Sequence, residues 1–408
     1  MANRTQRVVL VMDYGDIRGG LEKVCIESAL ALKAAGKDVV FFCGVAPVDP
    51  RLQAAGIQVH CIGVQDIASD PSKLRAARNG LWNNAAARKL DEVIRDTEDL
   101  SATVVHVHGW TKSLSSAIGP VVTAPDIRHV FTMHEYFFAC PNGGFYNYKT
   151  NEICNTPAMG LGCLSTNCDL RHPAHKAYRV ARKLVQSARG GLPSKVRNVI
   201  YISAVQQEVM QPYFPPSTTL WQVANPAVSE KRPAVNVAGN TDFCFVGRLV
   251  ETKGALEFAR AAHRARVPAV FIGDGPLRGA IKAANPQAVI LGWKQEDEVV
   301  QHLHNARTLV FPSKWYECQP LVPIEAQALG IPVICGDWCA ARETVLHEET
   351  GLHIRSLDEG GGFDHALTRL SSADYAAQLG QAAYDRYWAA PLTMQRHLDR
   401  LLGVYEQI

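Results

Sequence analysis

The chain of 408 residues lacks the long apolar segment of a membrane-spanning helix, because no hydrophobic run reaches ~18 residues. It also lacks a secretory leader, since its first residues, MANRTQRVVLVMDYG, become polar too soon to form one. These absences argue against an integral membrane protein and a secreted protein, and we expect a cytoplasmic location. The length favours two domains of roughly 200 residues over a single core.

Neither sign of charge dominates the sequence. The 42 Lys and Arg residues against 39 Asp and Glu residues leave a net charge of +3. Charge alone therefore gives no indication of a nucleic-acid partner, and we expect none. The cysteine number, 11, is odd, which argues against a disulfide framework and favours thiols or metal ligands.

Two series of alternating strand and helix patterns are present. The first series contains the apolar runs RVVLVMD, KDVVFFCG, IQVHCIG, ATVVHVHG, HVFTMHE and NVIYIS, with helices over LEKVCIESALALKAAG and over residues 74–95. The second follows the polar stretch PAVSEKRPAVNVAGN and contains TDFCFVGRLV, PAVFIGDG, AVILGW, TLVFPS and IPVICG. Residues 140–168, between HVFTMHE and NVIYIS of the first series, read as a long loop. The alternation predicts an α/β protein with two Rossmann-like, doubly wound domains.

Two loops have the composition of phosphate-binding segments. FVGRLVETKG places Arg248 and Lys253 between a strand and a helix, where two cations suit a diphosphate; the alternative is a pair of solvated surface cations. Gly19 and Gly20 lie in the first strand–helix turn, where glycines let the backbone approach a ligand. That turn is not a complete GxGxxG motif, which counts against a nicotinamide enzyme.

The segment KWYECQPLVPIEAQALGIPVI carries two acids that a structural helix does not need. Glu317 precedes a helix predicted from about Pro320 to Leu329, and Glu325 lies within that helix. Carboxylates accept hydrogen bonds from vicinal hydroxyls, and a helix N-terminus between them holds an anion. This layout predicts a sugar nucleotide ligand. The alternative is that Glu325 is a buried acid paired with a lysine.

These segments resemble those of retaining glycosyltransferases of family 4, the group 1 glycosyltransferases. The resemblance also includes GDIRGGLEKV, FIGDGP, and LGW followed by a helix and FPS. The resemblance runs from about Val8 to Leu402. It implies the GT-B fold, with two Rossmann-like domains facing across a cleft and a C-terminal helix returning to the N-terminal domain. We expect an acceptor-binding domain over 1–228, a donor-binding domain over 229–385 and the returning helix over 386–408.

The resemblance also implies roles for individual residues. Glu325 would bind the nucleotide ribose, Glu317 the donor sugar hydroxyls, and Arg248 and Lys253 the departing diphosphate. The remaining positions would form the phosphate cradle and the reacting end: Gly19, Gly20 and the backbone near Gln319, Leu321 and Val322 for the cradle, and His134 beside the reacting sugar. Packing against the sheet is the alternative for His134, and His106 and His108 are further acceptor-side candidates.

The reaction implied is transfer of a hexosyl group from a nucleotide-diphosphate sugar, a UDP- or GDP-sugar, to a hydroxyl acceptor with retention of anomeric configuration. It would need no metal or other cofactor, and the acceptor would be a glycan or lipid-linked glycan in polysaccharide synthesis. Two alternatives remain open at this point. They are a sugar-nucleotide epimerase and a non-catalytic sugar-nucleotide-binding protein of the same fold.

Two further features lie outside these motifs. Cys140, Cys154, Cys163 and Cys168 fall in the long loop, where they would hold a structural zinc ion or remain free thiols. The acid-free stretch from Arg171 to Arg197 would place Arg179, Arg182, Lys183 and Gln186 on one side of a helix. We expect that side to contact anionic lipid at the inner face of the membrane or an anionic acceptor; a solvated helix is the alternative.

Overall fold

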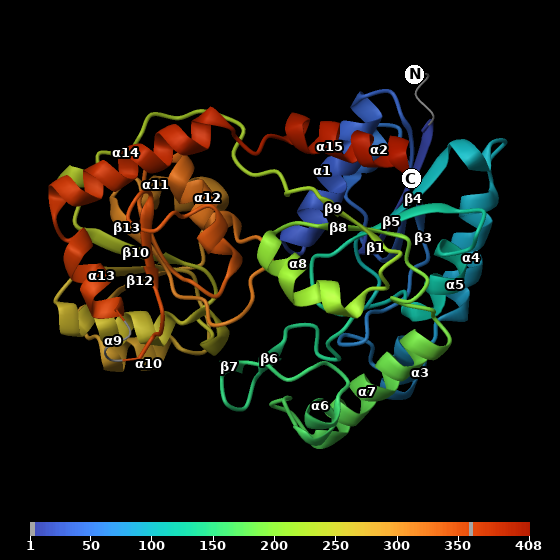
Figure 1. Cartoon of the computed structure of the whole chain (residues 1–408), viewed down its shortest axis with the longest axis horizontal. Helices are drawn as coiled ribbons and strands as arrows, with labels where there is room; N and C mark the ends of the chain where they lie inside the picture. Colours follow the sequence, from blue (N-terminus) through green and yellow to red (C-terminus); the bar gives the residue numbers. More distant parts are fainter. Residues whose placement is uncertain (1–4, 359–361) are drawn as a thin grey trace. The chain divides into compact units, whose positions relative to one another are not determined.

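The structure is a computed structural model that describes residues 5–358 and 362–408. The chain forms two compact units (Figure 1). The first comprises Met1–Phe145, Asn155–Pro226 and Met394–Ile408, and the second comprises Tyr146–Cys154 and Ala227–Thr393. The bounds expected from the sequence were 1–228, 229–385 and 386–408. None of the described helices is both long and apolar enough to cross a membrane.

The first unit contains a seven-stranded parallel sheet in the order β3-β2-β1-β4-β5-β8-β9. Its central strand, β1, is apolar along nearly its whole length because helices cover both faces, and Val8, Val9 and Leu10 have no exposed surface. The strands of this sheet are β1 Arg7–Tyr14, β2 Asp38–Val45, β3 Gln58–Cys61, β4 Thr103–Val107, β5 Arg128–Thr132, β8 Asn198–Tyr201 and β9 Thr219–Gln222.

Most helices of the first unit lie between successive strands of the sheet in chain order. The helices of this unit are α1 Gly20–Ala34, α2 Pro50–Ala54, α3 Lys73–Leu81, α4 Asn84–Arg95, α5 Gly119–Val122, α6 Leu161–Ser165, α7 Pro173–Ala188, α8 Ala204–Met210 and α15 Met394–Gln407, with short 3-10 turns at Leu100–Ala102, Ser116–Ile118 and Gln211–Tyr213.

The single helix predicted over residues 74–95 is wrong, because the chain breaks it into α3 and α4. The Asn83 side chain accepts a hydrogen bond from the Ala86 N–H at 3.1 Å and donates one to the Ser113 carbonyl at 2.9 Å. Asparagine competes with the helical backbone in this way and therefore starts a new helix. The segment expected to be one long loop over 140–168 also contains α6 and a hairpin of two short strands, β6 Tyr146–Asn147 and β7 Glu152–Ile153.

The second unit contains a six-stranded parallel sheet in the order β12-β11-β10-β13-β14-β15. Its strands are β10 Asp242–Val246, β11 Ala269–Ile272, β12 Val289–Gly292, β13 Ala306–Phe311, β14 Val333–Gly336 and β15 Gly351–Ile354. Its helices are α9 Ala255–Ala265, α10 Arg278–Ala284, α11 Glu296–Leu303, α12 Leu321–Ala328, α13 Phe363–Leu370 and α14 Ala373–Ala389, with 3-10 turns at Val237–Gly239, Glu251–Lys253 and Ala340–Glu343.

The C-terminal helix α15 packs on the first unit, beside α1 (Figure 1). Its buried side chains, Leu398, Leu401, Val404 and Tyr405, belong to the same hydrophobic core as β1 and α1. His397 of this helix hydrogen-bonds Ser28 of α1 at 3.1 Å through Nε2. The chain therefore completes the core of its first unit only with its last residues.

We expect Leu401→Ala to lower the free energy of unfolding by about 2–5 kcal/mol, since Leu401 is 1% exposed and its removal leaves a cavity. Urea unfolding followed by far-UV circular dichroism measures this change. Arg400→Ala, at an exposed position on the same helix, is the matched control and should change stability little. Equal effects of the two substitutions would show that α15 does not contribute to the core.

Candidate functional site

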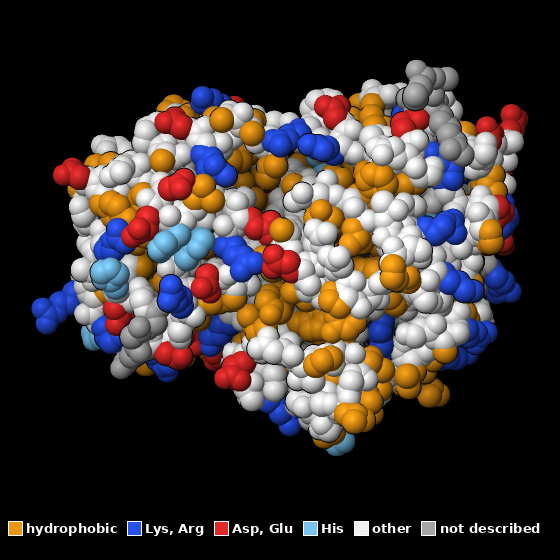
Figure 2. Space-filling view, in the orientation of Figure 1, with side chains coloured by type: hydrophobic (Ala, Val, Ile, Leu, Met, Phe, Trp, Pro, Cys, Tyr) orange, Lys and Arg blue, Asp and Glu red, His pale blue; other side chains and the backbone are white. Residues whose placement is uncertain are grey.

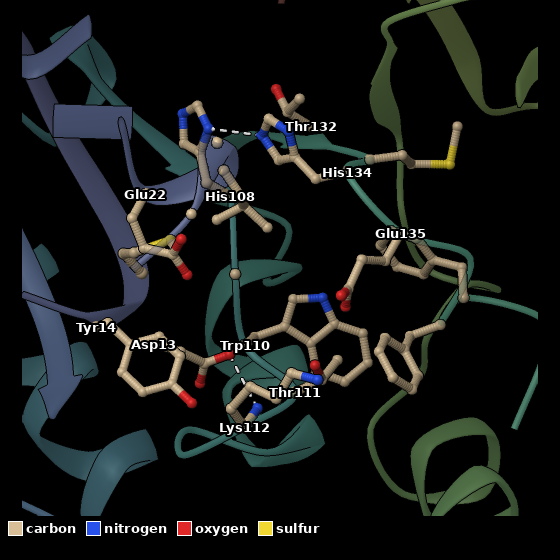
Figure 3. A pocket seen from close by; sticks show the side chains of 18 residues that line it. Asp13, Tyr14, Glu22, His108, Trp110, Thr111, Lys112, Thr132, His134 and Glu135 are labelled. Carbon is tan, nitrogen blue, oxygen red and sulfur yellow. Dashed lines mark hydrogen bonds between the residues drawn. The ribbon is translucent and has the colours of Figure 1, made fainter. Parts of the chain in front are cut away.

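Both sheets reverse their strand order at one point, between β1 and β4 in the first unit and between β10 and β13 in the second. In open parallel sheets, ligands bind outside the carboxyl ends of the strands at such points. In the first unit a pocket of about 250 Å³ lies at this place, lined by residues that follow β1, β4 and β5 and by the start of α1 (Figure 3).

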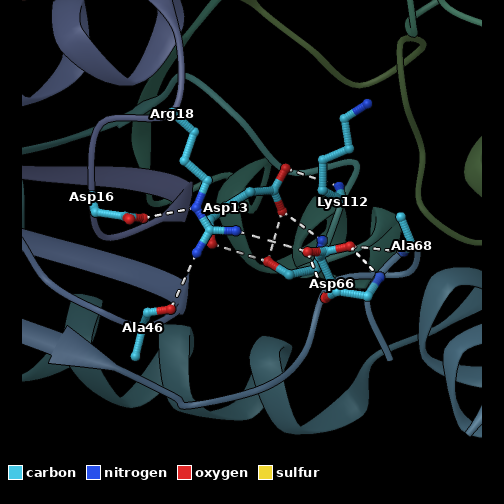
Figure 4. A network of polar contacts seen from close by, with 9 residues as sticks. Asp13, Asp16, Arg18, Ala46, Asp66, Ala68 and Lys112 are labelled. Carbon is cyan, nitrogen blue, oxygen red and sulfur yellow. Dashed lines mark hydrogen bonds and ion pairs between the residues drawn. The ribbon is translucent and has the colours of Figure 1, made fainter. Parts of the chain in front are cut away.

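The buried carboxylate of Asp13, at the end of β1, fixes the loop that follows β4. It accepts hydrogen bonds from the backbone N–H groups of Lys112 at 2.9 Å, Ser113 at 2.7 Å and Leu114 at 3.1 Å (Figure 4). The Ser113 hydroxyl donates to the same carboxylate at 2.8 Å. With this many donors, Asp13 is a structural anchor of the pocket wall.

The turn before α1 is held by Arg18. Its guanidinium donates to Asp16 at 2.9 Å and to the Ala46 carbonyl at 3.2 Å (Figure 4). It also lies 4.2 Å from the centre of the Tyr14 ring. Gly19 and Gly20 follow at once and line the pocket. Both glycines therefore lie where the sequence predicted a ligand-facing loop.

His134, the predicted acceptor-side histidine, lines the same pocket and belongs to a chain of three histidines. His134 Nε2 lies 3.1 Å from His108 Nδ1 (Figure 3), and His106 hydrogen-bonds the Tyr405 hydroxyl and the Thr132 hydroxyl, both at 2.6 Å. Burial lowers the pKa of all three histidines, and lowers that of His134 to about 3. His134 is therefore a neutral hydrogen-bonding group at physiological pH.

Two carboxylates in the pocket were not predicted from the sequence. Glu22 follows the glycine pair and Glu135 follows His134, and in Figure 3 both side chains point into the pocket from opposite sides. Burial raises the pKa of Glu22, and repulsion from Glu135 and Asp13 adds to that effect. Glu135 is an exposed residue, and repulsion from Asp13 contributes to raising its pKa. The sequence signal that could have identified them is their position near residues already predicted to face a ligand.

In the second unit, the predicted residues Lys253 and Glu317 form an ion pair. Glu317 also accepts a hydrogen bond from the Ser313 hydroxyl at 2.7 Å, and the Lys253 ammonium lies 5.5 Å from the centre of the Trp315 ring. The side chains of Lys253 and Glu317 are only 22% and 12% exposed. Lys253 is therefore held in place and is not the solvated surface cation of the alternative interpretation.

A glycine brings these two loops together. Gly254, which starts α9, has φ of +69°, and a Cβ atom there would lie 2.1 Å from the Pro312 carbonyl oxygen. Any side chain would push the Lys253 loop away from the end of β13. Arg248, on the same loop, is exposed, and its guanidinium makes no hydrogen bond or ion pair with any side chain in the described part of the chain.

The predicted helix over 320–329 is α12, which begins after Pro320. No side chain caps its N-terminus, so the backbone N–H groups of Leu321 and Val322 stand at a positive helix end near Gln319. Glu325 lies in the second turn, close to Tyr387, whose pKa burial raises to about 12 with a small contribution from the Glu325 carboxylate. The structure thus places these residues on or beside the helix that follows β13.

The four cysteines proposed as zinc ligands do not form a metal site in the residues that the structure describes, where no three His, Cys, Asp or Glu side chains are grouped to hold an ion. The Lys176 ammonium donates to the thiols of Cys163 and Cys168, both at 3.5 Å, and so occupies a place where a cation would bind. Cys140 contacts Asn142, and Cys154 belongs to the second unit. All four are free thiols.

The side of α7 proposed to contact lipid is turned into the first unit, so that proposal is wrong for this side, as is the solvated alternative. Arg182 donates to the carbonyls of Gly80 at 3.0 Å and Thr111 at 2.6 Å, Lys183 donates to the Phe138 carbonyl, and Arg179 pairs with Asp169. Buried carbonyls attract these cations. Hydrophobic side chains reach the surface nearby, over α3 and α6 (Figure 2), among them Leu74 and Leu161.

We expect the free energy of unfolding to fall as the pH is lowered below about 6.5. The pKa values of His106, His108 and His134 are depressed in the folded chain, so the unfolded chain binds protons that the folded chain does not. Urea titrations at a series of pH values measure this slope. His106→Gln should flatten it and His365→Gln, at an exposed site, should not; equal slopes in both variants would contradict the assignment.

Two family models match this chain. One, described as glycosyl transferases group 1, matches residues 240–372, and the other, described as a glycosyl transferase 4-like domain, matches residues 19–226.

Similar proteins carry related names. The alpha-maltose-1-phosphate synthase of Mycobacterium tuberculosis is 24% identical over 358 residues, which is 81% of this chain and 84% of that protein. The GDP-mannose-dependent alpha-mannosyltransferase of the same organism is 29% identical over 170 residues, 40% of this chain and 42% of that protein. The structure of Anabaena Alr3699/HepE in complex with UDP and glucose is similar with a TM-score of 0.65 at 14% identity, covering 98% of this chain and 99% of that one.

The predicted fold is confirmed as GT-B by the likeness to solved glycosyltransferases and by the two parallel sheets. The predicted enzyme class is confirmed by the family models, and the epimerase alternative gains no support. The chain belongs to the group 1, 4-like family of glycosyl transferases and is a glycosyltransferase.

Proposed function

We propose that this enzyme binds a nucleotide-diphosphate sugar, a UDP- or GDP-sugar, in its second unit. The observation that carries the proposal is the ion pair of Lys253 with Glu317, which fixes an ammonium group at the carboxyl ends of β10 and β13. Arg248 on the same loop adds a second cation, and the N-terminus of α12 adds two N–H donors. Related proteins are named for GDP-mannose or were crystallised with UDP, which supports this donor class.

Each donor-site residue has a distinct role in this proposal. Arg248 and Lys253 neutralise the diphosphate, Glu325 accepts hydrogen bonds from the ribose, and Glu317 both positions Lys253 and accepts hydrogen bonds from the donor sugar. Gln319, Leu321 and Val322 bring the start of α12 to the phosphates. Gly19 and Gly20 line the pocket of the first unit, where glycine lets the backbone approach a ligand closely.

The reaction retains the configuration of the transferred sugar. The bond between its anomeric carbon and the phosphate oxygen breaks, and the acceptor oxygen bonds to that carbon on the same face. The acceptor proton passes to the leaving phosphate. Cationic side chains stabilise the charge that develops on the diphosphate, so no metal ion is required. Neutral His134 orients the acceptor hydroxyl or the reacting sugar by hydrogen bonding.

The acceptor binds in the pocket of the first unit, as a hydroxyl of a glycan or a lipid-linked glycan in polysaccharide synthesis. We place this reaction in the cytoplasm, with any membrane contact made through a part of the first unit other than the inward side of α7. The exposed leucines over α3 and α6 support such a contact surface.

Lys253→Ala should lower kcat by about 10²–10³-fold, because it removes a charge that stabilises the leaving diphosphate. Release of the nucleoside diphosphate from UDP-glucose and GDP-mannose, with EDTA present throughout, measures this effect. Arg260→Ala removes an exposed cation from α9 and is the control. Activity that is lost in EDTA, or equal in the two variants, would contradict the proposed leaving-group site.

The product of a single turnover should carry the same anomeric configuration as the donor sugar. The coupling constant of the anomeric proton, measured by NMR on freshly formed product, reports it directly. An inverted product would rule out the proposed same-face attack.

A further inference from the structure

The pocket of the first unit carries an excess of negative charge. Three carboxylates, those of Asp13, Glu22 and Glu135, line it against a single ammonium, that of Lys112. The Asp13 carboxylate already accepts hydrogen bonds from three backbone N–H groups of the loop after β4. Glu22 and Glu135 are left to face the pocket.

Glu22 is buried, and no side chain of another described residue hydrogen-bonds its carboxylate. It is 9% exposed and lies in the first turn of α1. Burial raises its pKa, and its own backbone N–H and the nearby Arg18 guanidinium lower the pKa against that effect. No other residue in the described ranges donates a hydrogen bond to its carboxylate. The acceptor positions of this carboxylate can therefore take hydrogen bonds from the hydroxyl groups of a ligand.

Glu135 stands across the pocket from Glu22 (Figure 3). Lys112 is the nearby cation that lowers its pKa, and the Lys112 ammonium lies 5.3 Å from the centre of the Phe137 ring. No described residue forms an ion pair with Glu135. The two glutamates therefore present acceptor oxygens to the same small volume from opposite walls.

The rest of the pocket suits one sugar ring. Trp110 and Phe137 line it and offer aromatic surface to the C–H face of a pyranose, while His134 offers a neutral hydrogen-bonding group. The volume of about 250 Å³ is at the small end of ligand pockets. Hydroxyl groups can donate to both glutamates, whereas a phosphate or carboxylate would meet the like charge of buried Glu22 and of exposed Glu135.

We propose that this pocket selects an acceptor whose reacting sugar is an uncharged saccharide unit, with hydroxyls donated to Glu22 and Glu135, and that it rejects sugars phosphorylated at that unit. The inference rests on the proposed function, in which this pocket holds the acceptor. The proposed transfer step is unchanged. The acceptor oxygen bonds to the anomeric carbon, the bond between that carbon and the donor's phosphate oxygen breaks, and the hydroxyl proton passes to the leaving phosphate. Glu22 and Glu135 are specificity-determining residues.

The test compares sugars in matched pairs, with and without a 6-phosphate: glucose, mannose, galactose and N-acetylglucosamine. Saturation-transfer NMR measures binding of each sugar to the enzyme in the absence of donor, so its result does not depend on turnover. We expect at least one uncharged sugar to bind at least about tenfold more tightly than its phosphate. Glu22→Gln and Glu135→Gln should reduce that ratio toward unity. A phosphate that binds more tightly, a ratio unchanged in both variants, or no sugar binding would overturn the proposal.

Hydrolysis of UDP-glucose and GDP-mannose without acceptor is the second arm. If the wild-type enzyme hydrolyses neither donor, the donor assignment is contradicted, independently of the result of the sugar-binding measurement. A melting curve of Glu22→Gln distinguishes a loss of sugar selectivity from a loss of folding stability. Because the pKa of Glu22 is raised above 4.5 in the folded chain, its carboxylate destabilises the fold as the pH rises, and glutamine should raise the melting temperature at neutral pH. A variant that is more stable but less selective marks a binding residue; a less stable variant with unchanged selectivity marks a structural one.

Discussion

Parallel strand pairing is the constraint on which the site depends. In the large sheet of each unit all strands are parallel, so loops from distant parts of the sequence meet at one edge of that sheet. In the first unit this edge carries His134 after β5, and in the second unit it carries Lys253 after β10 and Glu317 after β13. The apolar runs of the central strands leave no room for polar chemistry inside the sheets. Chemistry is therefore confined to the residues that follow the strands, and their spacing is set by close contacts such as that of Gly254 with Pro312.

The two units offer opposite electrostatic environments to their ligands. The loops after β10 and β13 hold cations, one of them locked by Glu317, which suits a diphosphate. The pocket after β1, β4 and β5 holds Glu22, Glu135 and a neutral histidine, which suits hydroxyl groups. This division agrees with a transfer reaction in which the charged leaving group stays with one unit and the uncharged nucleophile enters from the other. The proposed specificity of the acceptor pocket follows from the same contrast.

Much of this could be predicted from the sequence, because central strands are continuous apolar runs and phosphate loops carry glycine and cations. Lys253 and Glu317 were identified, although they are separated by 64 positions, through a resemblance to a family and not through their pairing. Glu22 was missed because its sequence position does not reveal that it is buried, and exposed Glu135 was missed because no motif marks it as facing a pocket. The orientation of α7 was missed for a similar reason: its basic side binds backbone carbonyls at Gly80, Thr111 and Phe138 that no local pattern reveals.

The central claim is that the second unit binds the nucleotide diphosphate. A thermal-shift comparison of UDP and GDP on the wild type, Arg248→Ala and Glu325→Ala tests it most directly. One of the two ligands, at about 100-fold above its dissociation constant, should stabilise the wild type by about 2.7 kcal/mol and neither variant by a comparable amount. Glu22→Gln should retain the full shift. An unchanged shift in Arg248→Ala and Glu325→Ala, or no shift in the wild type, would contradict the account.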